Sequence, residues 1–326
     1  MKTSSSPQAA GRSPRPAKTG RTTGIEWTHH TWNPFVGCSP KSPGCWNCYA
    51  EDWSGNMQRM GKSTAYQGVI KMVNGRPRWT GAVNLATPAT LAKIDRIKAA
   101  TPLIFVNSMS DFWHENAKDE WRSLVFQKIR NRSDLIFQIL TKRPENIGPM
   151  LGRMGETVPD NVWLGATVED HRVLERIDIL RSVPAKTRFI SVEPMIAPFT
   201  GPQADGRSFG PALLERISGH IHQIIGGGES GSRARSCEPH WAIELRDLCL
   251  EAGVPFFWKQ WGKPANNPVY RVALEKTGSR KATLAYLKRE DPEGKGGSLI
   301  EGKAWKEFPV CYTGPSPAAA LPVYAP

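Results

Sequence analysis

The sequence predicts an α/β protein whose parallel strands form a partial or closed (β/α) barrel. Short apolar runs alternate along the chain with longer segments that carry apolar residues at helical spacing, which is typical of βαβ units. Polar or charged residues follow each apolar run, and in a parallel sheet such residues gather at one edge. An open doubly wound sheet would place its site at the same edge, so the pattern predicts the fold class better than the closure of the barrel.

Six apolar runs have the length and the β-branched or aromatic content of buried strands. We expect strands at Leu103–Asn107, Leu135–Thr141, Val162–Thr167, Arg188–Val192, Gln223–Gly227 and Pro255–Lys259. Four other segments have apolar residues at helical spacing. We expect helices at Ala86–Ala100, Glu120–Arg130, Arg172–Arg181 and Trp241–Glu251.

Every expected strand ends at, or just before, residues that can bind a ligand. These residues are Asn107, Ser108 and Asp111, then Thr141 and Lys142, Thr167 and Glu169, Glu193, Glu229, and finally Lys259 and Gln260. Polar residues after one strand could arise by chance, but polar residues after six strands in series indicate a sheet whose carboxyl ends share one site.

Three regions of different composition divide the chain. Residues 1–24 are rich in Ser, Pro, Gly and basic residues and lack Leu, Ile and Phe, so we expect a disordered basic tail. Residues 25–262 contain all the expected strands and should form the barrel domain. Residues 263–326 are polar and interrupted by Pro and Gly, which predicts an irregular C-terminal extension.

The formal net charge is +13, and the tail holds five basic residues and no acidic residue, which leaves +8 for the rest of the chain. A surplus of this size favours polyanionic partners, DNA or other nucleic acid first, although a basic surface that serves only solubility accounts for it equally well. No run approaches the roughly 18 apolar residues needed to span a bilayer, and the N-terminus lacks the apolar core of a secretory signal. We therefore expect a cytoplasmic protein without membrane contact.

Three of the six cysteines lie in one short loop, at Cys38, Cys45 and Cys48. A cytosolic chain of this length does not need disulfides, and clustered thiols there more often bind metal. The two-residue gap lets neighbouring thiolates reach a common centre, and the Pro- and Gly-containing segment between Cys38 and Cys45 can fold back to deliver the third. Three thiolates suit a [4Fe–4S] cluster whose open iron can bind S-adenosylmethionine (SAM).

Two alternative roles for these cysteines remain open. His29 or His30 can complete a tetrahedral zinc site with the three thiols. The thiols can also be unliganded, although a loop rich in Gly and Pro is poorly suited to ordinary core packing.

The segment from Asn33 to Ala50 resembles the cluster loop of radical SAM proteins related to spore photoproduct lyase. These proteins share an Asn-Pro-aromatic opening, Gly-Cys pairs and a final Cys-Tyr-Ala, and their cysteines are usually separated by three and then two residues. This chain has three extra residues in the first gap, and Asn47 stands where an aromatic residue commonly precedes the third cysteine. The resemblance implies a barrel of the radical SAM type, with adenine packing that differs from the usual one.

A second resemblance covers the chain from Trp27 to Gly262 and is to a phage-associated three-cysteine family without an assigned function. The similar strings are Phe105–Asp111, Leu140–Pro144, Ser191–Pro194, Gly226–Gly231 and Phe256–Gly262. This resemblance supplies expectations about the fold and the cofactor but none about the substrate.

The strand-end residues are the candidates for binding the cofactor. The backbone of Gly227 and Gly228 can approach a ligand closely, Glu229 can bind ribose hydroxyls or the amino group of SAM, and Lys142 can pair with the methionyl carboxylate. We expect further polar contacts from Asn107, Ser108, Asp111, Glu169 and Glu193. The same residues also have structural explanations: a tight turn for the glycines, a solvated loop for Lys142 and helix capping for the acidic residues.

Three further residues are candidates for contact with the substrate. His114 follows Asp111 and can donate a proton, although a lone histidine is more often structural. Lys259 and Gln260 lie between Trp258 and Trp261, a combination of charge and aromatic faces that nucleobase recognition uses and that core packing also produces.

The sequence thus favours a radical SAM enzyme that modifies or repairs a nucleic-acid base or nucleotide and takes electrons from a donor such as flavodoxin or ferredoxin. A zinc-stabilised nucleic-acid-binding protein without catalysis is one alternative. A radical SAM enzyme acting on a peptide or a small metabolite is the other.

Overall fold

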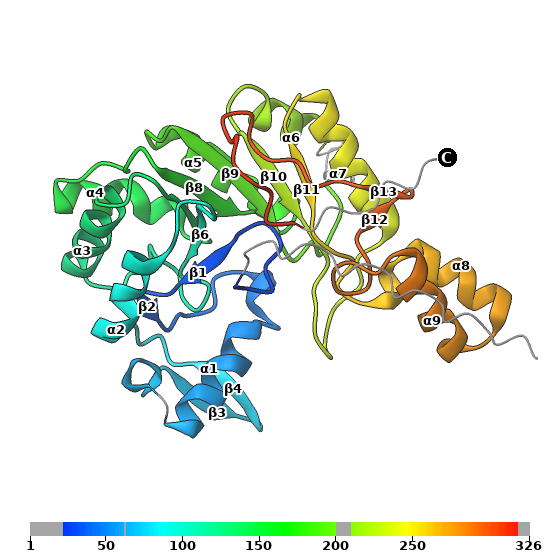
Figure 1. Ribbon diagram of the computed structural model, residues 1–326, viewed down its shortest axis with the longest axis horizontal. Coiled ribbons are helices and arrows are strands. Elements are labelled where there is room, and N and C mark those ends of the chain that lie inside the picture. Colours follow the sequence, from blue (N-terminus) through cyan, green and yellow to red (C-terminus); the bar gives the residue numbers. More distant parts are fainter. Residues whose placement is uncertain (1–21, 62, 200–209, 319–326) are drawn as a thin grey trace, which may run out of the picture.

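The computed structural model describes residues 22–61, 63–199 and 210–318, so almost all of the expected basic tail lies outside the described residues. Its centre is one parallel sheet of seven strands in the order β1-β6-β7-β8-β9-β10-β11. The strands are β1 (His30–Trp32), β6 (Leu103–Val106), β7 (Ile136–Thr141), β8 (Val162–Thr167), β9 (Thr187–Val192), β10 (Gln223–Gly226) and β11 (Phe256–Trp258). The sheet is curled, and β1 and β11 are its unpaired edges (Figure 1). The α/β class is therefore confirmed, and the barrel is partial.

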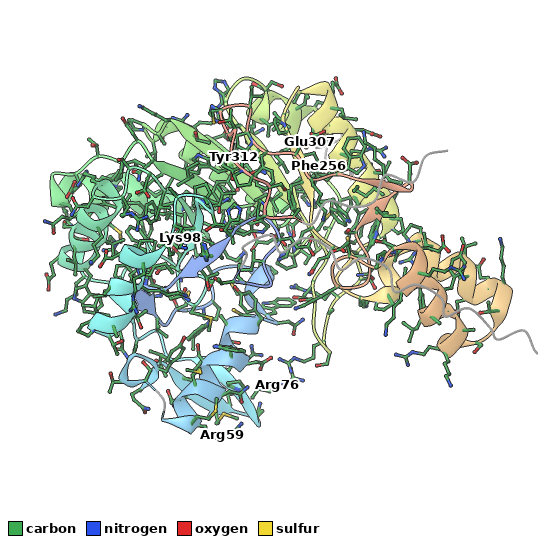
Figure 2. All side chains as sticks on the ribbon, viewed as in Figure 1. Arg59, Arg76, Lys98, Phe256, Glu307 and Tyr312 are labelled. Carbon is green, nitrogen blue, oxygen red and sulfur yellow. The ribbon has the colours of Figure 1, made fainter. Side chains whose placement is uncertain are left out.

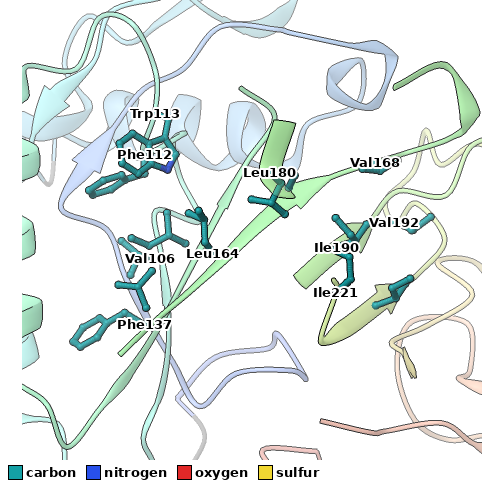
Figure 3. Close-up of a cluster of buried hydrophobic side chains, with 14 of the residues drawn as sticks. Val106, Phe112, Trp113, Phe137, Leu164, Val168, Leu180, Ile190, Val192 and Ile221 are labelled. Atoms are coloured by element: carbon teal, nitrogen blue, oxygen red, sulfur yellow. The ribbon is translucent and has the colours of Figure 1, made fainter. Parts of the chain in front are cut away.

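Helices connect successive strands and cover the outer, convex face of the sheet (Figure 1). They are α3 (Asp119–Arg130), α4 (Ile147–Met154), α5 (Glu175–Ser182), α6 (Gly210–Ile217) and α7 (Pro239–Glu251). Alternate strand residues such as Phe137, Leu164 and Ile190 point toward these helices and form the main core (Figure 3). The helix expected over residues 86–100 is shorter, with α2 (Pro88–Leu91) passing into a 3₁₀ turn, where Arg132 donates to the carbonyls of Ile94 and Ile97.

The concave face of the sheet has its own apolar cluster, formed by the other set of alternating strand residues. Phe105, Trp163, Phe189 and Phe257 belong to this cluster. Trp27 packs against it from the segment before β1, with its ring centre 4.6 Å from that of Phe105. The part of the concave face away from the carboxyl ends of the strands is therefore filled with side chains, and the part at those ends is polar.

The C-terminal segment is more regular than expected. It forms α8 (Pro268–Thr277), α9 (Arg280–Glu290) and a small hairpin of β12 (Leu299–Ile300) and β13 (Lys303–Ala304). The Asn267 and Ser279 side chains cap the two helices by accepting hydrogen bonds from Val269 and Ala282 nitrogens. The chain then returns to β11, where Glu307 N donates to Phe256 O at 3.1 Å (Figure 2).

A small lobe lies between β1 and β6 in the sequence (Figure 1). It contains β2 (Phe35–Val36) paired with β5 (Asn84–Leu85), helix α1 (Tyr49–Met60), and a hairpin of β3 (Ile70–Val73) and β4 (Arg76–Trp79). The hairpin turns at Asn74 and Gly75, which both have positive φ, as a two-residue turn of this kind requires. In the part of the chain that the structure describes, no helix could span a membrane.

Candidate functional site

The cysteine loop connects β2 to α1 and lies at the carboxyl edge of the sheet. Gly37 pairs with Ser110, just beyond β6, and its φ of 106° together with the nearby Ala82 carbonyl excludes a side chain there. Cys38 follows directly, Cys45 ends a 3₁₀ turn (Pro43–Cys45), and Cys48 is the residue before α1. The backbone of the small lobe thus brings all three cysteines to one edge of the sheet.

Polar contacts attach this loop to segments that follow four different strands. Ser39 contacts His114 beyond β6, Arg143 beyond β7 contacts Ser39, and Ser42 donates to Glu169 beyond β8. Asn47 donates to Glu229 beyond β10 at 3.1 Å. The loop therefore extends across the same strand ends that the sequence marks as a binding site.

All three thiols are free and half-buried. Burial raises the pKa of Cys38 and of Cys48, and the neighbouring thiols of the loop raise both further. A bound cation would favour the thiolate forms that this burial opposes. Over the described ranges, however, no three His, Cys, Asp or Glu side chains are gathered closely enough to hold a metal ion. The donor set and its position suit a cluster held by three cysteines, and binding would require the thiols to converge.

The two histidines considered as zinc ligands are engaged elsewhere. Both ring nitrogens of His30 lie 2.8 Å from threonine hydroxyls, those of Thr22 and Thr101. His29 Nδ1 accepts a hydrogen bond from Leu103 N. Zinc binding by His30, or by His29 through Nδ1, would therefore replace one of these hydrogen bonds.

Arg143 is a buried cation in direct contact with the cysteine loop, and sequence reasoning assigned it no role beyond its place in a similar string. Its Nη1 lies 3.9 Å from Cys38 Sγ, and its Nη2 donates to both Ser39 oxygens at 2.8 Å. The guanidinium is 3% exposed and forms ion pairs with Asp111 and Glu115. It can stabilise a thiolate at Cys38 while holding the loop against the end of β7.

Asp111 connects the segments that follow β6 and β7. Its carboxylate accepts hydrogen bonds from Thr141 Oγ1 at 2.6 Å, Lys142 N at 3.0 Å and Trp113 N at 3.0 Å, in addition to the ion pair with Arg143. These contacts occupy the carboxylate, so the structure gives Asp111 a local role in loop geometry.

Lys142 and Glu169 form a pair across the ends of β7 and β8, with Lys142 Nζ 3.1 Å from Glu169 Oε1. Arg176 contacts the second carboxylate oxygen at 2.8 Å. Burial alone would raise the pKa of Glu169, but Lys142 and Arg176 hold it below its ordinary value. A Cβ at Gly44 would overlap this carboxylate, so the cysteine loop lies directly over the pair.

A second pair lies across the ends of β9 and β11. Lys259 Nζ is 2.8 Å from Glu193 Oε1, and Trp27 Nε1 donates to Glu193 Oε2 at 3.0 Å. A Cβ at Gly227 would approach Glu193 Oε1 to 3.0 Å, so the missing side chain leaves room beside the carboxylate. Lys142, Glu169, Glu193 and Lys259 therefore give the edge two positive and two negative groups.

The remaining cofactor candidates are buried or half-buried. A side chain at Gly228 would overlap the Trp261 carbonyl, so backbone packing accounts for this glycine. Glu229 is held by Arg235 and Asn47, whose contacts outweigh burial and lower its pKa. Asn107 has φ 63° and a buried amide nitrogen without a hydrogen-bond partner among the described residues. Ser108 contacts Asn33 through its hydroxyl.

Lys259 and Gln260, the substrate candidates at the end of β11, lie beside two buried tryptophans. Trp258 and Trp261 are completely buried and pack edge to face, with ring centres 5.0 Å apart. Their faces are part of the core, which agrees with the core-packing interpretation and leaves no face of these rings open to a nucleobase. Gln260 is also buried and its amide donates to Gly228 O at 3.4 Å, which leaves Lys259 as the charged group at this strand end.

His114 is fully buried between the cysteine loop and the loop after β6. Its Nδ1 accepts a hydrogen bond from Asn116 N at 3.0 Å, so its Nε2 carries the proton and donates to Ser39 Oγ at 2.8 Å. Burial and the Arg143 guanidinium lower the pKa of His114. The ring therefore positions the cysteine loop as a neutral group.

We expect this histidine to make stability depend on pH. The pKa of His114 is lower in the folded protein than its unfolded value of 6.5. Its contribution to the free energy of unfolding is therefore complete above pH 6.5 and is lost as the pH falls through the folded-state pKa. The variant His114→Gln keeps a donor for Ser39. Its free energy of unfolding should therefore fall less between about pH 7 and pH 5 than that of wild type does. Urea unfolding across this range measures the difference. The exposed His220→Gln is the control, and an H114Q slope equal to that of wild type would contradict the assignment.

Among known proteins, the chain matches the profile of a family described as Protein of unknown function (DUF5131), over residues 22–309. This range includes the cysteine loop, all seven strands of the sheet, α8 and α9. No curated protein matches the chain.

Proposed function

The chain belongs to the DUF5131 family of proteins of unknown function, and we propose that it is a radical SAM enzyme that acts on a nucleic-acid base or nucleotide. One observation carries the proposal: three free thiols of a single loop lie across the carboxyl edge of a partial (β/α) barrel. In such barrels this edge is where the reacting groups are placed.

Three cysteines leave one iron of a [4Fe–4S] cluster without a protein ligand. When bound, the reduced cluster supplies the one-electron cleavage of SAM that gives a 5′-deoxyadenosyl radical, which removes hydrogen from a substrate. The residues of this chain would hold Cys38, Cys45 and Cys48 in place through Arg143 and Asn47 and exclude water beneath the loop.

The two Lys–Glu pairs suit a zwitterionic ligand. SAM carries a carboxylate and an ammonium group on its methionyl part, and Lys142 and Glu169 present the opposite charges 3.1 Å apart. The carboxylate of such a ligand can take the place of Glu169 beside Lys142, and its ammonium group can take the place of Lys142 beside Glu169. No buried charge is then left unpaired. The buried, unpartnered amide nitrogen of Asn107 offers a further hydrogen-bond donor at the same edge.

A nucleic-acid substrate is supported by charge. The chain without its first 24 residues still has a net charge of +8, and polyanions are the partners that such a surplus favours. An electron donor of the flavodoxin or ferredoxin type would supply the reductant, and the proposed chemistry requires the reducing conditions of the cytoplasm.

The proposal is tested by oxygen-free purification followed by reconstitution with iron and sulfide. We expect a brown protein that contains iron and sulfide in equal amounts and converts SAM to 5′-deoxyadenosine when dithionite is added. A colourless protein that retains one equivalent of zinc would instead support the non-catalytic alternative. Formation of 5′-deoxyadenosine without any binding to nucleic acid at low salt would favour a peptide or small-metabolite substrate.

A further inference from the structure

Aromatic side chains are unusually exposed beside the cysteine loop. Trp46 is 63% exposed, and Tyr49 and Trp53 are each 58% exposed. Only one other aromatic side chain in the described residues, Tyr286, is among the large hydrophobic residues left exposed. Three large rings within eight residues therefore form a surface for which folding gives no reason, which we call the aromatic patch (Trp46, Tyr49 and Trp53).

Helix α1 has a packed side and an open side. Its packed side, with Glu51, Gly55 and Gln58, faces the β3–β4 hairpin. Gln58 Nε2 donates to Ile70 O, and a Cβ at Gly55 would approach Pro77 to 2.9 Å. The hairpin therefore covers one side of the helix closely.

Two rings of the aromatic patch lie on the open side of α1. Tyr49 and Trp53 are four residues apart and so share a side of the helix, roughly opposite the packed one. Tyr49 Oη donates to Ser108 O at 2.9 Å, which places this ring beside the segment that follows β6. Trp46 lies in the turn that precedes the helix. The patch consequently adjoins the carboxyl edge of the sheet.

Arginines flank the aromatic patch. The nearby acidic groups are each neutralised, Glu51 by Arg78, Asp52 by Arg233 and Glu229 by Arg235. The exposed cations Lys71 and Arg76 belong to the β3–β4 hairpin on the packed side of α1. Figure 2 shows Arg59 and Arg76 at the outer end of the lobe, so the cations beside the patch are the paired arginines. The Arg235 guanidinium lies 5.9 Å from the centre of the Trp46 ring.

We propose that the aromatic patch binds a single-stranded or locally unpaired nucleic acid by stacking its bases on Trp46, Tyr49 and Trp53. Stacked rings flanked by arginines are the combination that binds single strands without regard to sequence, because every base has an aromatic face and every phosphate a negative charge. Trp46 lies between Cys45 and Cys48, so a strand held here has neighbouring nucleotides beside the carboxyl edge of the sheet. The inference deepens the proposed function by naming unpaired bases as the substrate class, and it rests on that function for the chemistry alone.

The test uses the full chain and a fluorescein-labelled oligothymidylate of about 15 nucleotides, a length that spans a typical single-strand site. Fluorescence anisotropy should show binding at low salt. Trp53→Ala and Tyr49→Ala should each weaken the affinity about tenfold, because each removes one stacking surface. Tyr49→Phe keeps the ring and should bind as wild type does. Arg233→Ala, which removes an exposed arginine beside Trp53, should reduce the salt dependence by about one phosphate contact.

The control is Tyr286→Ala, which removes an exposed ring from α9 and should leave binding unchanged. All variants alter exposed side chains, so their thermal midpoints should match that of wild type, apart from a small loss in the two Tyr49 variants, which lack the hydrogen bond to Ser108 O. The inference is overturned if wild type does not bind the oligonucleotide, if the Trp53 and Tyr49 variants bind as tightly as wild type, or if these variants lose binding to anionic lipid vesicles instead. Because anisotropy is measured without SAM or reductant, failure of the radical chemistry and failure of this surface give separate results.

Discussion

Replacing Cys48 with alanine is expected to reduce the iron and sulfide content of the reconstituted protein, and its formation of 5′-deoxyadenosine, to background. Two thiolates cannot hold a cluster that three are needed to bind. The same result is expected for Cys38→Ala and Cys45→Ala. Iron and sulfide analysis with the visible absorption spectrum provides the measurement.

The matched control is Cys311→Ser, because Cys311 is exposed and lies outside the cysteine loop. This variant should keep the iron content and the activity of wild type. Retention of a full cluster by Cys48→Ala, or its loss from Cys311→Ser, would disprove the assignment of the ligands. Far-ultraviolet circular dichroism of each variant separates loss of the cluster from loss of the fold.

The second large effect is expected from Asp111→Ala. This change removes the acceptor of three hydrogen bonds and leaves Arg143, which is 3% exposed, without its buried partner. Breaking a buried ion pair on one side typically costs about 3–5 kcal/mol, because the remaining charge stays desolvated. We expect the free energy of unfolding to fall by that amount in urea titrations.

Asp134→Ala is the control for this prediction. Asp134 pairs with Arg132 at 2.7 Å, but its side chain is 43% exposed, and exposed pairs contribute about 0–1 kcal/mol. A loss for Asp111→Ala no larger than that for Asp134→Ala would show that the Asp111 network does not stabilise the strand ends. The double variant Asp111→Ala/Arg143→Met should recover part of the loss, because it removes the unpaired charge as well.

The sheet was predictable because buried parallel strands leave continuous apolar runs in a sequence. Val162–Thr167 was predicted without error, and the other five expected strands differ from the structure by one residue at one or both ends. β1 was missed because its three residues are too few to show a pattern. The helices α8 and α9 were missed because their apolar periodicity is weak, while caps from Asn267 and Ser279 define their starts.

The positions of the site residues were also predictable, since strand ends of a parallel sheet lie at one edge. Their partners were not, because ion pairs such as Lys142–Glu169 and Lys259–Glu193 join residues from different strands and leave no trace in local periodicity. Helix α1 was missed for another reason. Its exposed aromatic rings occupy the side that is polar in an ordinary surface helix, so the amphipathic pattern is obscured.

The packing of C-terminal aromatic residues on the concave face has a consequence for folding during synthesis. Phe308 and Tyr312 reach the sheet only after every one of its strands has left the ribosome, since they follow β11 in the chain. Until then Trp163 and Phe257 lack part of their packing, and a nascent chain presents these rings to solvent or to a chaperone. Completion of the inner face therefore follows synthesis of the whole sheet, which makes chains stalled before Phe308 candidates for aggregation.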